Sequence, residues 1–496
     1  MTILAIDAGT TGVTALLVSA NAKVLTRGYT EFDQHFPQSG WVEHDPEQIW
    51  QAALNSVRQV LASDAVKLHG APTALGITDQ RETIALWDRA DLSSPRRAIV
   101  WQDRRTSYIC DTYKAEGHEN RVTELTGLRL DPYFSATKLH WIERNEPNVW
   151  AGVQLGRTAV GTIDSYLIAR LTAGRLHVTD ASNASRTLLY DINSNTWSTE
   201  LCELFNVPID ALPKIVPSYG PIGNTDPDAF LGIEIPIAGI AGDQQAALFG
   251  QACFRPGSSK CTYGTGSFVL VNTGDTIVRS DAGLLSTVAW MHPDGHVDYA
   301  LEGAIFVTGS AIQWLRDGLR ILDSAAQSQA LAETVPDSDG VVFVPALTGL
   351  GAPDWDPTAR GVIMGLSRGT TRAHIARATL EAIAFEVRDV VDVMTDEAQV
   401  NLPQLTVDGG AAANDLLCQL QADQIQVPVV RSEVLETTGQ GAAFLAGLGT
   451  GVWTSLDELA ATWRSDATFH PGERDEAAHR RWRVAVAASR GWASLA

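Results

Sequence analysis

Two segments of the sequence share one plan, and this repeat limits the possible folds more than any other feature. In the first, an apolar run at residues 3–6 leads into a turn at residues 7–12, and residues 13–18 resume as an apolar run. In the second, residues 261–263 lead into a turn at 264–266, and residues 267–271 follow. Each pattern predicts a β-hairpin. Because one hairpin opens each half of the chain, we expect two related domains facing one another across a cleft.

The turns of both hairpins are rich in glycine and threonine. Gly9 and Gly12 permit backbone conformations that other residues avoid, and exposed amides beside threonine hydroxyls form an anion-binding concavity. An ordinary Gly-rich hairpin is the alternative. The second turn lacks the third glycine of a dinucleotide-binding fingerprint, and the chain contains no Gly-x-x-x-x-Gly-Lys-Ser/Thr loop. Phosphate binding therefore requires a different scaffold from either of those loops.

Length and composition exclude several classes of protein. The chain of 496 residues exceeds the roughly 250–300 at which single cores stop growing. A net charge of −21 argues against nucleic-acid binding, which depends on Lys and Arg. Five scattered cysteines without a Cys-x-x-Cys pair indicate neither a disulfide framework nor a zinc site. No Lys or Arg precedes Lys23 and no apolar run reaches ~18 residues, so we expect no signal peptide, no membrane span and a cytoplasmic location.

A single carboxylate stands at the centre of the chain. An apolar run at residues 233–240 meets a small-residue helical pattern, and Asp243 lies at the join. Residues at the carboxyl end of a strand point into the crevice where open α/β folds bind ligands. A carboxylate there can accept a proton from a hydroxyl group. Capping of the following helix is the alternative role for Asp243.

Other polar residues also follow predicted strands. A strand at 74–77 delivers Arg81 and Glu82, which fit either a surface ion pair or a donor and an acceptor for a polyhydroxyl ligand. In the second half, glycines before helices would let backbone amides approach a phosphate. The stretch 179–197, rich in Ser, Asn and Thr, predicts a surface hairpin region. The basic run 479–483 predicts a solvated helix face, with a partner site as the alternative.

With these residues placed, the chain resembles the FGGY family of carbohydrate kinases over nearly its whole length. Two long patterns fit the family signatures: Tyr133-x-Ser135-x-x-Lys138-Leu139-x-Trp141-Ile142-x-Arg144-Asn145, and Gly361-x-Ile363-x-Gly365-Leu366 followed by His374-Ile375-x-x-Ala378-Thr379-Leu380-Glu381. Within the family the likeness is greatest to the glycerol kinases, through the segments Gln80-Arg81-Glu82, Trp101-Gln102-Asp103, Asp131-Pro132-Tyr133 and Gly242-Asp243-Gln244-Gln245.

The resemblance implies a fold and an activity. The fold is α/β, with two ribonuclease-H-like domains of the actin type at residues 1–250 and 251–496 that face each other across a cleft. The activity is ATP-dependent phosphorylation of a terminal hydroxyl of glycerol, with Mg²⁺, to give glycerol 3-phosphate and ADP. A kinase of another small polyol or ketose, and an actin-like ATP-binding switch without a sugar substrate, are the alternatives. The resemblance is also compatible with assembly of the chain into a homodimer or a homotetramer.

The same resemblance assigns roles to residues. Asp243 would be the general base, and Asp7 and Asp243 would hold Mg²⁺. The substrate would be bound by Arg81, Glu82, Trp101, Tyr133, Asp243, Gln244 and Phe268. The nucleotide would be bound by Thr10, Thr11, Gly264, Thr265, Gly309, Gln313, Gly410, Ala411 and Asn414.

The sequence departs from the glycerol kinases in two places. Ala8 replaces a glutamine and Thr14 replaces an arginine in the first hairpin, so a phosphate-facing guanidinium is missing. This loss predicts weaker nucleotide binding or slower transfer. The segment 218–232 corresponds to a loop through which some glycerol kinases bind fructose 1,6-bisphosphate by an arginine, but it contains no Arg and carries Asp226 and Asp228. We therefore expect no binding of that bisphosphate.

Overall fold

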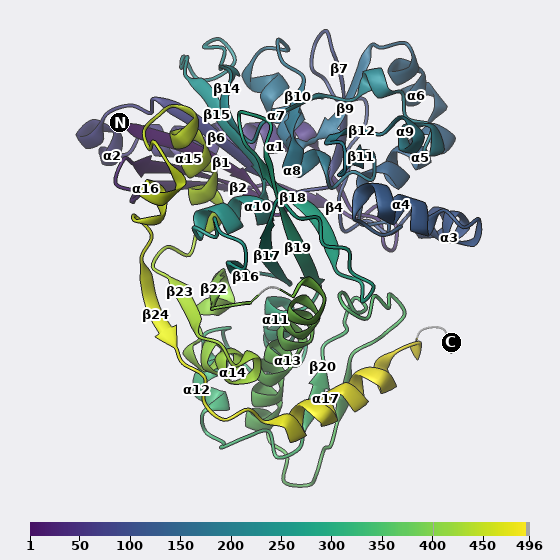
Figure 1. The fold of residues 1–496 in the computed structure, drawn as a ribbon, viewed down its shortest axis with the longest axis vertical. Helices are drawn as coiled ribbons and strands as arrows, with labels where there is room; N and C mark the ends of the chain where they lie inside the picture. The colour runs from purple at the N-terminus through teal and green to yellow at the C-terminus, as the bar shows by residue number, and fades with distance from the viewer. Residues whose placement is uncertain (400, 493–496) are drawn as a thin grey trace.

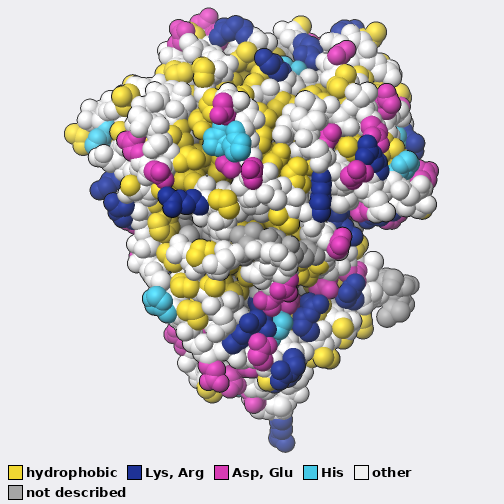
Figure 2. Space-filling view, viewed as in Figure 1, with side chains coloured by type: hydrophobic (Ala, Val, Ile, Leu, Met, Phe, Trp, Pro, Cys, Tyr) yellow, Lys and Arg dark blue, Asp and Glu magenta, His cyan; other side chains and the backbone are white. Residues whose placement is uncertain are grey.

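The protein, described here by a computed structural model, has two halves built on separate mixed sheets. The structure describes residues 1–399 and 401–492. In Figure 1 the N-terminal half, coloured purple to teal, forms the upper part of the molecule, and most of the C-terminal half lies below it. On the face drawn in Figure 2, basic and acidic side chains are interspersed and form no continuous basic patch.

The N-terminal sheet has the strand order β14-β15-β6-β1-β2-β3. Strand β1 pairs antiparallel with β2 and parallel with β6, β2 pairs antiparallel with β3, and β6 pairs parallel with β15. The bounds are β1 Thr2–Ala8, β2 Gly12–Ser19, β3 Val24–Glu31, β6 Ala74–Asp79, β14 Tyr219–Asn224 and β15 Pro236–Gly242.

The C-terminal sheet repeats this arrangement in the order β18-β19-β17-β16-β22-β23-β24. Strand β16 pairs antiparallel with β17 and parallel with β22, β17 pairs antiparallel with β19, and β22 pairs parallel with β23. The bounds are β16 Ser259–Tyr263, β17 Ser267–Gly274, β18 Leu285–Met291, β19 Val297–Ile305, β22 Leu405–Asp408, β23 Val429–Ser432 and β24 Ser465–Phe469.

The five shared strands therefore follow one topology in both halves. An antiparallel meander of three strands is extended by two parallel strands, and β14, β18 and β24 are additional edge strands. The predicted hairpins are β1–β2 and β16–β17. The prediction of two ribonuclease-H-like units of the actin type is confirmed, whereas the boundary at residue 250 stays a prediction.

Helix α1 (Pro46–Leu61) illustrates how the local sequence specifies an element. Asp45 is its N-cap and accepts a hydrogen bond from the Glu47 amide at 2.9 Å, and proline occupies the first turn as the sequence predicts. The apolar face, including Ile49 and Val57, is buried against β2 and β3. Ser56 Oγ on that face donates to the Val13 carbonyl at 2.8 Å.

Helix α15 (Thr437–Gly449) joins the two halves. It belongs to the C-terminal half of the chain but packs on β1, β6 and β15 of the N-terminal sheet, beside α10 (Asp243–Gly250) (Figure 1). A Cβ on Gly441 would lie 1.8 Å from the Ala246 carbonyl oxygen, so only glycine permits the approach of the two helices. The Gly/Ala composition of α15 therefore serves close helix packing.

A third sheet and the remaining helices surround these cores. The third sheet has the order β4-β5-β8-β7-β9 and lies in the N-terminal half. Its bounds are β4 Gln34–His35, β5 Glu43–His44, β7 Ile84–Asp88, β8 Ala98–Ile99 and β9 Thr158–Thr162. The small two-stranded sheets use β10 Val178–Asp180, β11 Tyr190–Asp191, β12 Thr196–Trp197, β13 Lys214–Val216, β20 Val342–Val344 and β21 Val362–Met364. The other helices are α2 Asp64–His69, α3 Ser107–Ala115, α4 Glu119–Thr126, α5 Ser135–Asn145, α6 Pro147–Gln154, α7 Ile163–Leu171, α8 Ala181–Ala184, α9 Thr199–Leu204, α11 Gly309–Asp317, α12 Gln327–Ala332, α13 Arg372–Ala398, α14 Asp415–Ile425, α16 Leu456–Ala460 and α17 Glu476–Ser489.

The prediction of a surface hairpin region at residues 179–197 is correct for only part of the stretch. Residues 190–197 form the hairpin β11–β12, and most of residues 191–197 are at least partly exposed. Residues 179–190, expected at the surface because of their Ser, Asn and Thr content, are buried. Many of their polar groups are hydrogen-bonded inside the protein: Asp180 accepts hydrogen bonds from Ser182 and Ser218, and Asn183 donates to Asp79 at 3.0 Å. Hydrogen-bonded polar side chains can be buried without a large cost, so composition alone misplaced this segment.

The other surface and membrane predictions have mixed outcomes. Of the basic run in α17, Arg480, Arg481 and Arg483 are exposed, but Trp482 is buried and donates to Asp389 at 3.0 Å. None of the helices in residues 1–399 and 401–492 combines the length and apolar composition needed to cross a membrane. All five cysteines are free and buried.

Candidate active site

Asp243 is the first residue of α10, directly after β15. Gly242, not Asp243, occupies the N-cap position, although the Asp243 carboxylate accepts a hydrogen bond from the Gln244 amide at 2.7 Å. The same carboxylate oxygen, Oδ1, lies 3.2 Å from Arg81 Nε, and 27% of the side chain is exposed. Asp243 thus satisfies one helix amide while it faces a cationic site that solvent can reach.

Arg81 is the hub of this site. Its guanidinium donates from Nη1 to Glu302 Oε2 at 2.5 Å, from Nη2 to Glu302 Oε1 at 3.1 Å and from Nη2 to the Tyr133 hydroxyl at 3.3 Å. Its Nη1 also donates to Gln245 Oε1 at 3.2 Å. A planar guanidinium can make all these contacts together because its donors point in fixed, divergent directions. The two halves of the chain therefore meet through Arg81 and Glu302.

A second arginine completes a buried network of alternating charges. Arg186 donates from Nε to Glu82 Oε1 at 2.7 Å and from Nη2 to Glu302 Oε1 at 2.8 Å. Arg81, Glu82, Arg186 and Glu302 are all buried, and the two cations balance the two anions. Buried charges of this kind are tolerated only when they are paired and hydrogen-bonded. The network thus fixes the guanidinium of Arg81 beside Asp243.

The carboxylates of the site differ in their proton affinity. Although burial opposes ionisation, Arg186 and Arg81 lower the pKa of Glu302 to about 2. Burial raises the pKa of Asp243, an effect that Arg81 and Lys260 oppose. Burial and then the charge of Asp243 raise the pKa of Asp7 to about 8. One carboxylate is therefore a fixed anion, and the other two are poised to exchange a proton or to accept a cation.

Glu82 adopts an unusual backbone conformation. Its φ is 63°, in the left-handed region that non-glycine residues seldom occupy, and its carbonyl accepts from Ser135 Oγ at 2.8 Å. Such strain persists only where surrounding contacts hold it, and it clusters at functional sites. The hydrogen bonds from Ser135 and Arg186 are the contacts that hold Glu82 in this conformation. Glu82 is therefore a buried residue of the site, and the alternative of a surface ion pair between Arg81 and Glu82 is wrong.

Three aromatic rings border the Arg81 hub. Trp101 lies edge-on to Tyr133 and to Phe268, with ring centroids 5.5 and 6.5 Å apart. The Arg81 guanidinium lies over the Phe268 ring, 5.7 Å from its centroid. Trp101 Nε1 donates to Thr10 Oγ1 at 3.0 Å, which ties this aromatic wall to the first hairpin turn. The wall offers apolar contact beside the charged groups.

A buried lysine positions Tyr133. Lys138 donates to the carbonyls of Pro132, Tyr133 and Phe134, and the latter two bonds measure 2.9 and 3.0 Å. Asp131 Oδ1 accepts from the Tyr133 amide at 2.8 Å. These bonds satisfy the carbonyls of the turn before α5 and direct the tyrosine hydroxyl toward Arg81.

Gln244 is held by a lysine from the second hairpin. Lys260 donates to Gln244 Oε1 at 2.5 Å and to Thr262 Oγ1 at 2.9 Å. Lys260 is fully buried, and burial lowers its pKa. The lysine therefore brings a positive charge from β16 to the start of α10.

Most of the residues predicted to bind nucleotide line one cavity. The cavity has a volume of about 380 Å³ and lies in the C-terminal half. Its walls include Gly264, Thr265, Gly309, Gln313, Gly410, Ala411 and Asn414. Close approach of the walls depends on glycine, because a Cβ on Gly309 would lie 2.5 Å from the Gly264 carbonyl oxygen. Thr10 and Thr11 are not part of these walls and lie in the β1–β2 turn instead.

Strand β3, which pairs with the first hairpin, contributes a basic residue, Arg27, that the sequence analysis did not identify. Asp7 pairs with Thr14 across β1 and β2, and Leu16 pairs with Arg27 across β2 and β3, so Asp7, Thr14 and Arg27 share one face of the sheet. Arg27 lies 3.2 Å from Glu436, and its charge lowers the pKa of Asp7 against the opposing effect of burial. Although position 14 is a threonine, the guanidinium of Arg27 therefore supplies a positive charge on the same face of the sheet.

The segment predicted not to bind a bisphosphate forms β14 and the turn after it. Arg175, which lies outside the segment, forms an ion pair with Asp226. One nearby cation is thus already neutralised, and the absence of bisphosphate binding stays a prediction.

Sequence reasoning missed Arg186, Glu302, Lys260 and Gln245. Glu302 lies in the buried part of β19, whose other charged residue is Asp298 near the start of the strand, and Lys260 is the only charged residue of β16. A charged residue within a buried, mainly apolar strand could have indicated both positions. Arg186 was hidden in the stretch interpreted as surface. No sequence pattern identifies Gln245 as a partner of Arg81.

Comparisons with known proteins agree over the whole chain. The model of the FGGY family of carbohydrate kinases, N-terminal domain, matches residues 2–250, and that of the C-terminal domain matches residues 259–450. The chain is 52% identical to glycerol kinase of Symbiobacterium thermophilum, with 99% of both chains covered, and 49% identical to glycerol kinase 2 of Thermotoga maritima, again with 99% of both covered.

Solved structures give the same result. The crystal structure of Plasmodium falciparum glycerol kinase with ADP superposes with a TM-score of 0.90 at 35% identity, covering 98% of each chain. A ligand-bound xylulose kinase of Lactobacillus acidophilus shares the fold, with a TM-score of 0.85 at 22% identity, over 100% of this chain and 97% of the other. The repeated sheets, the paired hairpins and these matches show that the chain belongs to the FGGY family of carbohydrate kinases.

Proposed function

We propose that the protein is a glycerol kinase, which transfers the γ-phosphoryl group of ATP to a terminal hydroxyl of glycerol and releases glycerol 3-phosphate and ADP. The observation that carries this proposal is the cluster in which Arg81 contacts Asp243, Tyr133 and Glu302 beside Trp101 and Phe268. Whole-chain relatives at 52% and 49% identity are glycerol kinases and support the choice of substrate.

The cluster suits a small polyol. Arg81 and the Tyr133 hydroxyl supply donors, Glu82 and Asp243 supply acceptors, and Trp101 and Phe268 offer apolar surface to the carbon chain. Buried polar groups that pair with substrate hydroxyls discriminate strongly against analogues lacking them, because those groups are then left unpaired. Glu302 and Arg186 are proposed to act indirectly: Glu302 holds Arg81 in place, and Arg186 holds Glu82 in place.

Asp243 is the group proposed to accept the proton. The glycerol hydroxyl loses its proton to the Asp243 carboxylate as its oxygen bonds to the γ-phosphorus, and the bond from that phosphorus to the bridging oxygen of ADP breaks. The raised pKa of Asp243 brings it closer to the operating pH, which favours a general base. Phosphoryl transfer otherwise demands positioning and charge neutralisation.

The carboxylates fit a magnesium ion. Burial and then the charge of Asp243 raise the pKa of Asp7 to about 8, so a cation would be favoured beside it. One or two carboxylates plus water and phosphate oxygens are the ligands that Mg²⁺ prefers. We assign Asp7 and Asp243 as its protein contacts. When bound, Mg²⁺ neutralises charge on the β- and γ-phosphates.

The nucleotide is proposed to occupy the 380 Å³ cavity, with its phosphates directed toward the Gly/Thr turns of the two hairpins. The nucleotide contacts are proposed to be those lining the cavity, together with Thr10 and Thr11 of the first turn. A homodimer or homotetramer and a cytoplasmic location complete the proposal, and the five free thiols fit a reducing compartment. Light scattering coupled to gel filtration measures the oligomeric state.

The test is ADP release from MgATP with glycerol, erythritol, xylulose or gluconate as acceptor. The proposal expects kcat/KM for glycerol to exceed that for each other acceptor by at least tenfold. Preference for another acceptor would assign the site to a different polyol or ketose. Acceptor-independent ADP release at the full rate would contradict a kinase role and favour an ATP-binding switch.

A further inference from the structure

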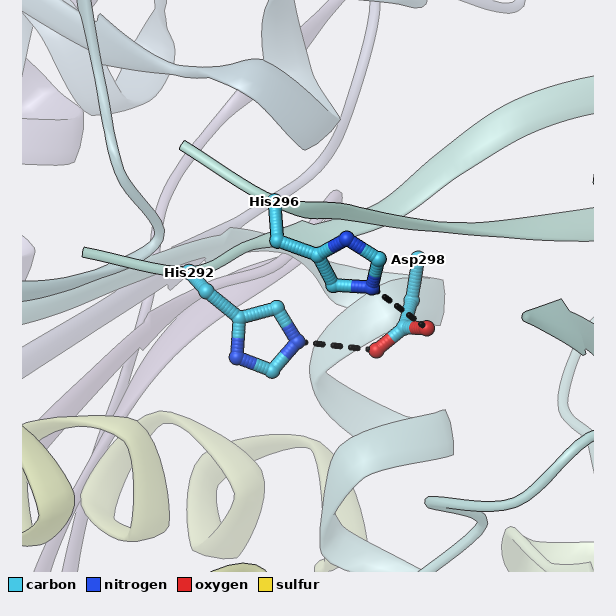
Figure 3. Close-up of side chains that lie close together, drawn as sticks. All are labelled: His292, His296 and Asp298. Atoms are coloured by element: carbon cyan, nitrogen blue, oxygen red, sulfur yellow. Dashed lines mark hydrogen bonds and ion pairs between the residues drawn. The ribbon is translucent and has the colours of Figure 1, made fainter. Parts of the chain in front are cut away.

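A compact group of metal-binding side chains lies at the tip of the β18–β19 hairpin. His292 and His296 flank the three-residue turn, and Asp298 follows two positions later on β19. Their ligand atoms all lie within 4.8 Å of one another. Figure 3 shows both imidazole rings turned toward the Asp298 carboxylate. None of these residues belongs to the Arg81 site.

The turn itself brings the three side chains together. The His292 amide donates to the His296 carbonyl at 2.8 Å, the Gly295 amide donates to the His292 carbonyl at 3.0 Å, and Gly295 has a φ of 87°. The two histidines therefore stand opposite each other across the hairpin. His296 immediately precedes β19 and Asp298 is the second residue of that strand, and the His296 ring and the Asp298 carboxylate face each other (Figure 3).

Both ring nitrogens of His292 have hydrogen-bonding partners. Trp290 Nε1 lies 3.1 Å from His292 Nε2, and the Tyr219 hydroxyl lies 2.8 Å from His292 Nδ1. In the tautomer protonated on Nδ1, His292 donates to Tyr219 and Nε2 carries the lone pair; in the other tautomer, Nε2 donates to Asp298. Histidines that bind metals are commonly oriented by such a bond from the other ring nitrogen.

The ring nitrogens of both histidines lie close to the Asp298 carboxylate. His292 Nε2 lies 2.9 Å from Asp298 Oδ2, and His296 Nε2 lies 3.9 Å from Asp298 Oδ1. A proton on Nε2 makes the 2.9 Å contact a hydrogen bond, and a metal ion bound to His292 Nε2 and Asp298 would replace that proton and the contact from Trp290. Two imidazole nitrogens and one carboxylate suit zinc-class transition metals, whereas Mg²⁺ and Ca²⁺ prefer oxygen ligands alone.

We propose that His292, His296 and Asp298 form a binding site for Zn²⁺ or a similar divalent transition metal, with Tyr219 orienting His292. Three protein ligands leave a coordination position for water, as in open zinc sites. The side chain of His296 is 53% exposed, so a metal ion can enter from solvent. The site contains no cysteine, which is why the cysteine pattern could not reveal it.

The site also lies where the two halves of the chain meet. Tyr219 belongs to β14 of the N-terminal sheet, and the Ser218 amide donates to the Met291 carbonyl at 2.8 Å. The Met291 amide donates back to Ser218 Oγ at 3.0 Å. A metal that fixes His292 therefore also fixes the contact between the hairpin tip and β14.

Metal binding to the chelator-treated full-length protein tests the proposal. Isothermal titration calorimetry with Zn²⁺, in excess Mg²⁺, should give one equivalent of tight binding, and Co²⁺ should develop visible d–d absorption. His296→Ala and Asp298→Asn should each weaken Zn²⁺ binding by at least tenfold. Tyr219→Phe should weaken it by about tenfold, the lower end of the range for partners that orient metal ligands.

His69→Ala is the matched control, because His69 is an exposed histidine on α2. It should bind Zn²⁺ as the wild type does. MgATP-dependent kinase activity of His296→Ala should equal that of the wild type, which shows that the variant is folded. The proposal is overturned if the wild type takes up no Zn²⁺, or if His296→Ala and Asp298→Asn bind it as tightly as His69→Ala does.

Discussion

Arg81 Nε lies 3.2 Å from Asp243 Oδ1, so a buried guanidinium and the proposed catalytic carboxylate, far apart in sequence, form one unit. Arg81 follows β6 and Asp243 follows β15, and these strands pair in parallel with Asp79 opposite Gly242. The carboxyl ends of the two strands therefore deliver both side chains to the same edge of the sheet. Glu302 from the other half of the chain completes the contact.

Arg81→Lys should impair substrate binding and turnover together. A lysine ammonium cannot contact Glu302, Tyr133 and Asp243 together, whereas the planar guanidinium of arginine can. Breaking a buried charge pair costs roughly 2–5 kcal/mol, so kcat/KM for glycerol should fall by about 10²-fold or more. Arg121→Lys, at a half-exposed surface arginine, is the control and should leave the kinetics unchanged. Unaltered steady-state kinetics in Arg81→Lys would remove Arg81 from the substrate site.

Glu302→Gln should destabilise the fold in a pH-dependent way. Removing one anion leaves Arg81 and Arg186 with uncompensated buried charge, which costs about 3–5 kcal/mol. The pKa of Glu302 is about 2 in the folded protein and near 4.5 when unfolded, so its stabilisation is complete above pH 4.5 and is lost as the pH falls toward 2. Urea midpoints of wild type and variant should differ at pH 7 and converge across that window. A constant difference from pH 7 to pH 3 would contradict this account.

Gly410→Leu should weaken nucleotide binding selectively. Gly410 lines the 380 Å³ cavity, and a Cβ there would meet no atom within 4 Å, so the leucine fits the backbone and fills the cavity. KM for ATP should rise at least tenfold, about 1.4 kcal/mol, with KM for glycerol nearly unchanged. Gly369→Leu is the matched control, because Gly369 is exposed and an added Cβ would meet Ser367 Oγ at an ordinary contact distance of 3.6 Å. Equal KM values for ATP in both variants would place the nucleotide elsewhere.

Arg27→Gln tests whether Arg27 supplies the basic charge that Thr14 lacks. Arg27 is half-exposed, and exposed pairs contribute about 0.2–1 kcal/mol, so binding of MgATP should weaken by about 1.4- to fivefold. Adding Thr14→Arg to this variant should restore the affinity, because residue 14 stands opposite Asp7. If neither change alters MgATP affinity, this face of the sheet does not contact the phosphates.

The fold was predictable because its repeated hairpins are local patterns. Each Gly/Thr turn lies between two apolar runs, and Asp45 with Pro46 marks the start of α1 within a residue. The positions of Arg81, Trp101, Tyr133, Asp243 and Phe268 were also predictable, through the family resemblance. The structure brings those five side chains together.

The ionic network was not predictable, because its partners are far apart in sequence. Arg186 lies among Ser, Asn and Thr residues whose hydrogen bonds are internal, and Glu302 interrupts an apolar strand. The local sequence around Arg186 and around Glu302 does not indicate which distant residue each side chain contacts. The packing of α15 on the N-terminal sheet was also missed, since helix periodicity does not specify which half a helix covers.

The most direct test of the account is the turnover of Asp243→Asn with MgATP and glycerol. Asparagine keeps the size of the side chain but cannot accept the proton, so kcat should fall by roughly 10²–10⁴-fold, the usual contribution of a general base, while glycerol still binds. Single-turnover quench-flow measurements separate the chemical step from product release. A rate constant for phosphoryl transfer within about threefold of the wild type would contradict the catalytic assignment and leave Asp243 as a residue that satisfies the first turn of α10.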